Sequence, residues 1–407
     1  MSVGLRSTGR RGRAGRLRSF GGAGMRVATA CLATALAIPC SACPFCGAVG
    51  ESLSQRRDRA AVLAIGESAA PAGRDRTGLP IQAMTVLRVL RGDAESPADT
   101  VVARVPGPID GTALIFADAD AEGDTPDAAP TMAWSAIAAD ESLIVHAVSA
   151  PPTTAPESDR LRWFASRLEH ANPAIAADAF TEFGLAPYAS VRAAADAFDD
   201  RTLARWIADP GVDQRRRGFY GLALGIVAAT NDDPATRARA LAAIRDAVAA
   251  PADDFRAGFD GLLAGLLVAD GTRGLATLER QGLLAESARA VDQKHAVAAL
   301  RFAWEHLAHT IPREAVATAT ARLLAAPVTA ADAAIDLARY RHWDAIDDVA
   351  ALWDTFGRDD PVVRRAVAGY LTACPLPAAR RAIDEIRHRD AERLDQAIHA
   401  AALPLAR

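Results

Sequence analysis

The chain has 407 residues, of which half are apolar but only 5% are aromatic, so alanine and leucine supply most of its hydrophobic content. Such a composition favours helices, because alanine loses no side-chain entropy in a helix and lets neighbouring helices pack closely. The 46 basic and 50 acidic residues leave a formal net charge of -4, which excludes the basic excess typical of nucleic-acid-binding proteins. We therefore expect no nucleic-acid partner.

Residues 1–42 have the pattern of an export signal. Within them, residues 27–38 form an apolar run that suits a signal-peptide core and is too short to span a bilayer. Small residues precede position 43, which suits cleavage after Ala42. The residues before Met25 are rich in Arg, Gly and Ser, so a start at Met25 would give a more ordinary signal peptide. We predict an exported protein of the periplasm, cell envelope or extracellular space, with no transmembrane span.

The mature chain would begin with a Cys-x-x-Cys motif formed by Cys43 and Cys46. Two cysteines at this spacing can cycle between dithiol and disulfide, and an oxidising compartment favours the disulfide. A thioredoxin-like enzyme places this motif after a central strand, and no strand pattern precedes it here. Cys43 also stands where a lipoprotein peptidase would attach a lipid anchor. A short-loop disulfide (or a disulfide with Cys40 if processing differs), a redox or metal-handling pair and a lipid anchor on Cys43 all remain open, and a disulfide is favoured.

Residues 43–150 carry short strand patterns that are separated by Gly, Pro and Asp clusters. Runs rich in Val, Ile and Leu predict five strands, at residues 60–65, 83–90, 100–105, 112–116 and 142–148. Five short strands in succession favour a small antiparallel barrel or sandwich. Residues 151–158 then contain three prolines and predict a stiff linker, because proline cannot donate a hydrogen bond to a helix or a ladder.

An acidic loop follows one of these strands and carries oxygen ligands at alternate positions, namely Asp118, Asp120, Glu122 and Asp124. This spacing, with Gly123 at the turn, is typical of the first half of a calcium-binding loop. The bidentate glutamate that would end such a loop is replaced by Ala129. A weak metal site and a solvated acidic loop both remain open, and we favour the solvated loop.

From Asp159 onward the hydrophobic pattern becomes helical. The first segment places its apolar residues on one helix face, at Leu161, Phe164, Ala165 and Leu168. An Asn-Pro or Asp-Pro pair recurs and predicts helix starts, because the Asx side chain caps free amides and proline is tolerated at the first helical position. These pairs begin at Asn172, Asp209, Asp233 and Asp360. Residues 159–407 thus predict about 14 to 16 helices in stacked pairs, an α-solenoid.

One of these helix starts resembles a known repeat family. The string Asp360-Pro361-Val362-Val363-Arg364 is similar to the start of the second helix of a HEAT repeat, and residues 171–180 show a weaker likeness. The resemblance covers roughly residues 158–403. It implies a mainly α protein with a HEAT-like solenoid, and a protein partner bound along the array, because HEAT arrays are binding scaffolds.

The β-domain resembles the tissue-inhibitor and netrin-like modules. The likeness rests on the cysteines at its start, followed by the segments at residues 60–67, 87–93 and 111–117. It implies an OB-like barrel of five strands. The chain has Cys-x-x-Cys where those modules have Cys-x-Cys, and it lacks their further cysteines, so only the fold is carried over. The whole arrangement also resembles uncharacterised secreted bacterial proteins.

A second candidate for metal binding lies in the helical part. Glu305, His306 and His309 fall within one predicted helix, and the two histidines are three residues apart on one face. Such a pair can supply two metal ligands, but no third ligand is evident and the HExxH order is absent. A half-buried or capping histidine pair is favoured. His146 and His342 are isolated in the sequence and receive no assignment.

No sequence pattern indicates a nucleophile elbow, a P-loop or a dinucleotide fingerprint. We therefore expect an exported scaffold that has no catalytic residues and no cofactor, and that binds a protein along the groove of its helical repeats. The alternative is a redox or metal-handling protein that acts through Cys43 and Cys46.

Overall fold

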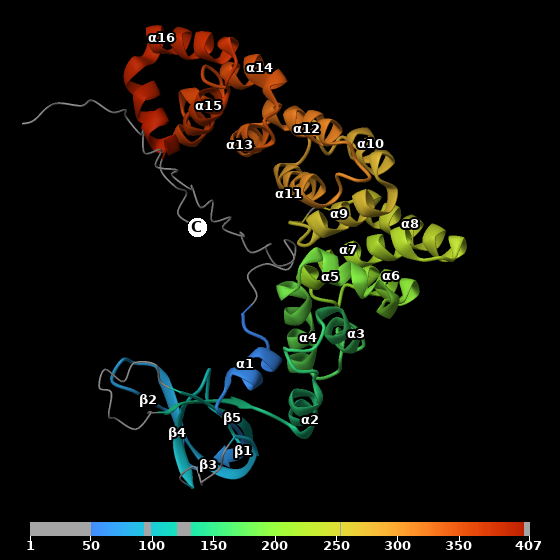
Figure 1. The fold of residues 1–407 in the computed structure, drawn as a ribbon, viewed down its shortest axis with the longest axis vertical. Coiled ribbons are helices and arrows are strands. Elements are labelled where there is room, and N and C mark those ends of the chain that lie inside the picture. The colour runs from blue at the N-terminus through green and yellow to red at the C-terminus, as the bar shows by residue number, and fades with distance from the viewer. Residues whose placement is uncertain (1–49, 93–98, 120–131, 253, 403–407) are drawn as a thin grey trace, which may run out of the picture. The chain divides into compact units, whose positions relative to one another are not determined.

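The computed structural model describes residues 50–92, 99–119, 132–252 and 254–402. These residues belong to one compact unit, Ser41–Arg407. They are mostly helical, with a small β-barrel near the N-terminal end (Figure 1). Among them, no helix combines the length and the hydrophobicity that a bilayer span requires.

The barrel is closed by five strands, with a sixth short strand attached. The strands are β1 (Val62–Ser68), β2 (Gly73–Arg74), β3 (Pro80–Arg91), β4 (Thr100–Arg104), β5 (Thr112–Ala119) and β6 (Met132–Ala138). The order β1-β5-β6-β4-β3 returns to β1, and β2 pairs only with β3. All pairings are antiparallel except β4 with β6, which is parallel. The interior is filled by small and medium apolar side chains, including Ala64, Met84, Val101, Ala103, Ile115 and Ala136.

Four of the five predicted strands are confirmed, and the fifth prediction is wrong. The segment expected as a strand at residues 142–148 is helix α2 (Glu141–Ser149). Asp140 caps this helix by accepting a hydrogen bond from the Leu143 amide at 2.8 Å. Leu143 and Ala147 pack on Phe116 of the barrel, so the apolar residues follow helical spacing. The missing strand is β6, whose alanine-rich sequence carries a weak strand signal of its own.

The helical part begins after α1 (Leu53–Arg59) and α2 and contains fourteen further α-helices among the described residues, within the expected number. They are α3 (Glu157–Ala165), α4 (Pro173–Leu185), α5 (Tyr188–Ala193), α6 (Asp200–Ala208), α7 (Gln214–Thr230), α8 (Pro234–Ala249), α9 (Phe259–Asp270), α10 (Thr272–Arg280), α11 (Ala290–His306), α12 (Arg313–Arg322), α13 (Ala330–Tyr340), α14 (Ile346–Ala351), α15 (Pro361–Ala373) and α16 (Pro377–Ala402). Short 3₁₀ turns lie at η1 (Ala195–Ala197), η2 (Leu323–Ala325), η3 (Trp343–Ala345) and η4 (Phe356–Arg358).

Three of the four predicted Asx-Pro helix starts are confirmed. Asn172, Asp233 and Asp360 each accept a hydrogen bond from an amide of the first turn of α4, α8 or α15. The fourth pair does not open a helix. Asp209 instead accepts a hydrogen bond from the Gly211 amide at 2.8 Å, in the turn between α6 and α7. An Asx-Pro pair favours a turn as much as a helix start, and here the chain turns.

Helices that are adjacent or two apart in the sequence pack together, and one apolar core runs through the helical part. The closest approach is between α7 and α9, where glycines allow the two backbones to touch. A Cβ added to Gly265 would lie 2.1 Å from the Gly221 carbonyl oxygen, and one added to Gly225 would lie 2.3 Å from the Gly265 carbonyl oxygen. Any side chain at these positions would push α7 away from α9.

Candidate functional site

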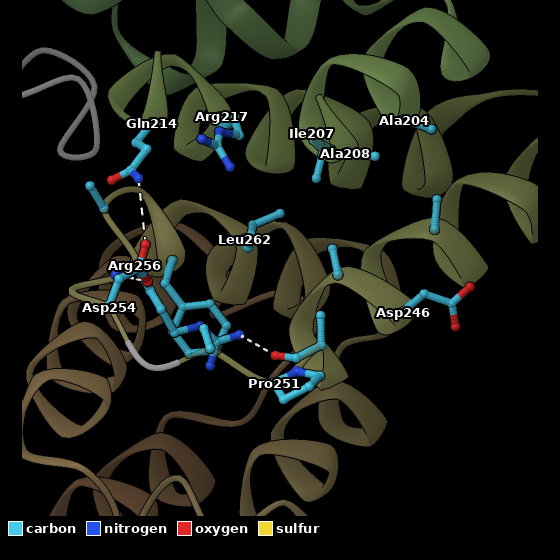
Figure 2. Close-up of a pocket in the computed structure, with 16 residues that line it drawn as sticks. Ala204, Ile207, Ala208, Gln214, Arg217, Asp246, Pro251, Asp254, Arg256 and Leu262 are labelled. Carbon is cyan, nitrogen blue, oxygen red and sulfur yellow. Dashed lines mark hydrogen bonds between the residues drawn. The ribbon is translucent and has the colours of Figure 1, made fainter. Parts of the chain in front are cut away.

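A pocket of about 610 Å³ opens between α6, α7, α8 and α9, and we call it the α6–α9 groove. Figure 2 shows Ile207 and Ala208 of α6 on one side, Pro251 on the other, and Leu262 of α9 between them. The lining is mainly apolar, with polar side chains toward its edges. The lining residues are Ala204, Ile207, Ala208, Gln214, Arg217, Ala243, Asp246, Ala247, Ala250, Pro251, Ala252, Asp254, Arg256, Ala257, Phe259 and Leu262.

The groove is hollow because one of its walls carries short side chains. Helix α8 and the segment after it contribute Ala243, Ala247 and Ala250, where longer side chains would fill the space. Leu262 and Phe259 of α9 also line the groove, and the glycine contacts hold this helix against α7. Pockets that are mostly apolar and carry a few placed polar groups are the usual form of binding sites in proteins.

Arg256 holds the loop that forms the lower edge of the groove in Figure 2. Its guanidinium lies 3.3 Å from the centre of the Phe259 ring and donates to the Val248 and Ala250 carbonyls at the end of α8. Burial lowers the pKa of Arg256, and the Asp292 carboxylate 3.7 Å away opposes this. These contacts occupy Arg256, so we assign it a positioning role in the loop.

Arg217 of α7 lines the opposite edge and is less engaged. Its Nε donates to the Val212 carbonyl at 3.2 Å, whereas the neighbouring Arg216 is the residue that pairs with Glu169; Arg217 has no ion pair with a carboxylate of the described residues. Beside it, the Gln214 amide donates to Asp254 at 3.5 Å. Arg217 and Gln214 therefore place a positive charge and an amide group at this edge, where a ligand could reach them.

His295 of α11 contacts the same loop. Its Nε2 lies 3.1 Å from the Phe255 carbonyl oxygen, and its Nδ1 lies 3.7 Å from an Asp260 carboxylate oxygen. Burial is the largest influence and lowers the pKa of His295, but the contacts with Asp260 and the Phe255 carbonyl together leave the pKa raised. These two contacts tie the loop to α9 and α11.

A second polar region lies where α1, α2, α3 and α4 meet, and we call its residues the junction cluster: Ser52, His146, Arg160, Asp178 and Glu182. The His146 Nε2 lies 2.8 Å from one Asp178 carboxylate oxygen, and the other accepts a hydrogen bond from the Leu53 amide at 2.7 Å. Arg160 forms an ion pair with Glu182. All five residues are buried. Burial raises the pKa of Glu182, and Ser52 and Arg160 only partly oppose it.

Arg57 of α1 binds the end of α2. Its guanidinium donates to the carbonyls of Ala147, Ala150 and Pro151, at 2.9, 2.6 and 3.2 Å. A cation at this place satisfies free carbonyls and the negative end of the helix dipole. Next to it, Asp58 accepts a hydrogen bond from the Thr153 amide at 2.6 Å. The start of the proline-rich segment 151–158 is thus bound to α1.

Hydrogen bonds hold the pKa of Asp58 far below its usual value. Burial, the largest influence, raises this pKa, but the hydrogen bonds from Arg57 and Thr153 outweigh it and lower the pKa to about 2. Asp58 is therefore ionised at any pH near neutrality, and its charge pairs with Arg57 at 2.7 Å.

One group of described residues has the arrangement of metal ligands: Glu314, His342 and Asp344. Their ligand atoms all lie within 4.8 Å of one another. No assignment for His342 follows from the sequence, because Glu314 belongs to a different helix, α12, and the periodicity of a single helix cannot reveal it.

Of the cysteine and acidic candidates from the sequence, Asp118 belongs to the described residues. Cys43, Cys46, Asp120, Glu122 and Asp124 lie outside the described residues. Asp118 lies near the end of β5, and one of its carboxylate oxygens is 3.3 Å from the Arg59 guanidinium. In the described part of the chain, Asp118 therefore takes part in an ion pair.

The two histidines expected on one helix face do not share it. Helix α11 ends at His306, and His309 follows in an exposed turn. The His306 ring packs against Tyr188 and Phe302, with centroids 5.1 and 4.9 Å apart, and burial lowers its pKa. These contacts give His306 a packing role and do not bring it together with His309.

No protein-family model and no curated protein matches this chain. Among solved structures, the chain is similar to human deoxyhypusine hydroxylase in complex with glycerol, at 16% identity, over 63% of this chain and 86% of that one. The TM-score of this match is 0.25. A likeness at this level carries no argument about fold or function.

Proposed function

We propose that this chain is an exported, non-catalytic scaffold whose helices form a HEAT-like solenoid and whose α6–α9 groove binds a segment of a partner protein. The α6–α9 groove carries this proposal, because it is hollow, mainly apolar and open at edges that bear polar groups. The packing of helices that are adjacent or two apart in sequence supports the solenoid.

The chemistry of the groove favours an extended peptide with an aliphatic side chain next to an acidic one. The aliphatic side chain would pack on Leu262 and Ile207 between the short alanines of α8. Arg217 would pair with the acidic side chain, since the carboxylates of the described residues leave it without an ion pair. Gln214 offers an amide to the peptide backbone.

The barrel supports a second part of the same proposal. Without β2, its five strands follow the order 1-2-3-5-4 around a closed barrel, with the third and fifth strands parallel. This connectivity supports an OB-like module at the N-terminal end of the scaffold. We propose that this module carries the exported N-terminus and leaves binding to the helices.

Selection of peptides on the purified chain tests the groove. A displayed library of random peptides should yield binders that share an aliphatic residue beside an acidic one. Their affinity should fall at least about 10-fold for Leu262→Asp, because a buried carboxylate without a partner opposes apolar contact. Val362→Asp is the matched control, since Val362 is an apolar side chain that is 57% exposed on α15. Selected peptides that bind Leu262→Asp as tightly as the unchanged chain would contradict the proposal.

The alternative function uses Cys43 and Cys46, which lie outside the described residues, and it stays a proposal of its own. A redox or metal-handling protein would lose its activity in the double variant Cys43→Ser/Cys46→Ser, while peptide binding in the groove would persist. Thiol–disulfide exchange with a small disulfide measures the first property, and the selected peptides measure the second.

A further inference from the structure

We propose that Glu314, His342 and Asp344 bind a divalent transition-metal ion, for which Zn²⁺ is the best match. Glu314 belongs to the first turn of α12, His342 follows the end of α13, and Asp344 lies in η3. None of these three residues lines the α6–α9 groove, so the site goes beyond the proposed function.

The distances between the ligand atoms suit one ion. The His342 Nδ1 lies 3.4 Å from a Glu314 carboxylate oxygen, and the atoms of all three residues lie within 4.8 Å of one another. Ligands bound to one zinc at about 2.0–2.2 Å in a tetrahedron are roughly 3.3–3.6 Å apart. To bind one ion, the ligand atoms of the three residues must therefore move together by about 1 Å. Glu314 and Asp344 are exposed and free to make this movement.

His342 is the fixed member of the set. Its amide donates to the Leu337 carbonyl at 3.0 Å, and its carbonyl accepts a hydrogen bond from the Tyr370 hydroxyl at 2.7 Å. The side chain of His342 is only 10% exposed. Arg341 before it adopts a left-handed conformation, with φ of 56°, where α13 ends. The backbone of His342 is thus held in place and its side chain is mostly buried, while the two exposed carboxylates can adjust to complete the coordination.

The three residues face a pocket of about 250 Å³. Trp304 and Tyr340 also line it, and their rings stack at 3.8 Å. Three protein ligands leave at least one coordination position for water or another ligand, and this pocket gives the space for it. The same pocket is lined by Arg313 and Arg341, whose charges offset those of the two carboxylates. We therefore expect a site of moderate affinity that accepts an anion as its further ligand.

The ligand types select among metals. Imidazole together with carboxylates suits zinc and its first-row neighbours, whereas calcium takes six to eight oxygen ligands. A set with one nitrogen and two carboxylates therefore favours Zn²⁺ over Ca²⁺ and Mg²⁺.

Titration of the chelator-treated full chain with ZnCl₂, followed by calorimetry, tests the proposal. The titrations use a Cys43→Ser/Cys46→Ser background, so that those thiols bind no zinc. One zinc per chain is expected, with the Kd raised at least about 10-fold in Glu314→Gln and in His342→Ala. His306→Ala is the matched control, because His306 is a half-buried histidine outside the site. The Kd of this variant for zinc should equal that of the starting chain. Arg341→Gln should lower the Kd, since it removes a competing charge.

Two results would overturn the proposal: the absence of zinc binding in the Cys43→Ser/Cys46→Ser chain, or an unchanged Kd in Glu314→Gln. The Glu314 side chain is 72% exposed, so its exchange for glutamine should leave the fold intact and keeps the test decisive where His342→Ala unfolds. Substitution by Co²⁺ adds a spectroscopic check. Its visible absorption should show tetrahedral coordination in the starting chain and lose intensity in Glu314→Gln.

Discussion

The junction cluster and the α6–α9 groove both combine charged and apolar side chains, but the charged side chains lie in different surroundings. At the junction, His146, Asp178, Arg160 and Glu182 are buried and paired with one another. In the groove, the apolar residues form the wall, and the charged ones stand at the edges. Buried pairs add little net stability yet are costly to break, whereas edge charges remain available to a ligand. The comparison assigns a structural role to the first region and a binding role to the second.

The largest effect is expected from breaking the junction. Asp178→Ala would remove the partner of His146 and of the Leu53 amide, and the loss of one member of a buried ionisable pair costs about 3–5 kcal/mol. Urea unfolding measures this loss. The double variant His146→Leu/Asp178→Leu should recover part of it, because both polar groups are then gone. A loss below about 1 kcal/mol in Asp178→Ala would contradict the structural role.

The next effect concerns the helix pair under the groove. Gly265→Val should cost about 3 kcal/mol and also abolish peptide binding, because a side chain there meets the backbone of Gly221 and forces α7 from α9. Gly369→Ala on α15 is the matched control. Its Cβ would make only an ordinary contact of 3.5 Å, and alanine should add about 0.5–1 kcal/mol of stability. Thermal and urea unfolding of both variants test the contrast.

The contact between α1 and the segment after α2 should weaken in acid, because Asp58 is part of it. Because its pKa falls from 3.8 to about 2 on folding, its contribution is present above the unfolded pKa and is lost as the pH falls through about 2. The contribution is on the order of 2 kcal/mol at neutral pH. Asp58→Asn should flatten the dependence of stability on pH between about 4 and 2, as urea unfolding over this range would show. If stability depends on pH in Asp58→Asn as steeply as in the unchanged chain, the hydrogen bond between Asp58 and the Thr153 amide does not contribute in this way.

The loop at the edge of the groove should weaken as the pH rises, because His295 helps to hold it. This is the smallest of the expected effects. Its pKa is raised on folding, so its contribution is fully present below the unfolded value of about 6.5 and is lost as the pH rises through the folded value. Hydrogen exchange of the amides at residues 254–258 should therefore quicken above this pH. His295→Gln should remove that dependence, and an identical pH profile in the variant would show that His295 does not hold the loop.

Local signals predicted much of the fold and little of the sites. The caps at Asn172, Asp233 and Asp360 act within one helical turn, so the sequence can predict them. The strand patterns of β1, β3, β4 and β5 alternate over a few residues and can be predicted for the same reason. The segment at 142–148 was misassigned because β-branched residues can enter a helix when a cap and a core partner favour it.

Local structure follows from short stretches of the chain: the high helix content, most strands, three Asx-Pro helix starts and the buried apolar faces. Which distant side chains meet depends on the folded core. His146 and Asp178 are 32 residues apart, and Glu314 meets His342 only because α12 packs against α13. Hydrogen bonds and packing within a turn depend on near neighbours, whereas a pair across helices depends on how the whole core closes, which no short window of sequence contains.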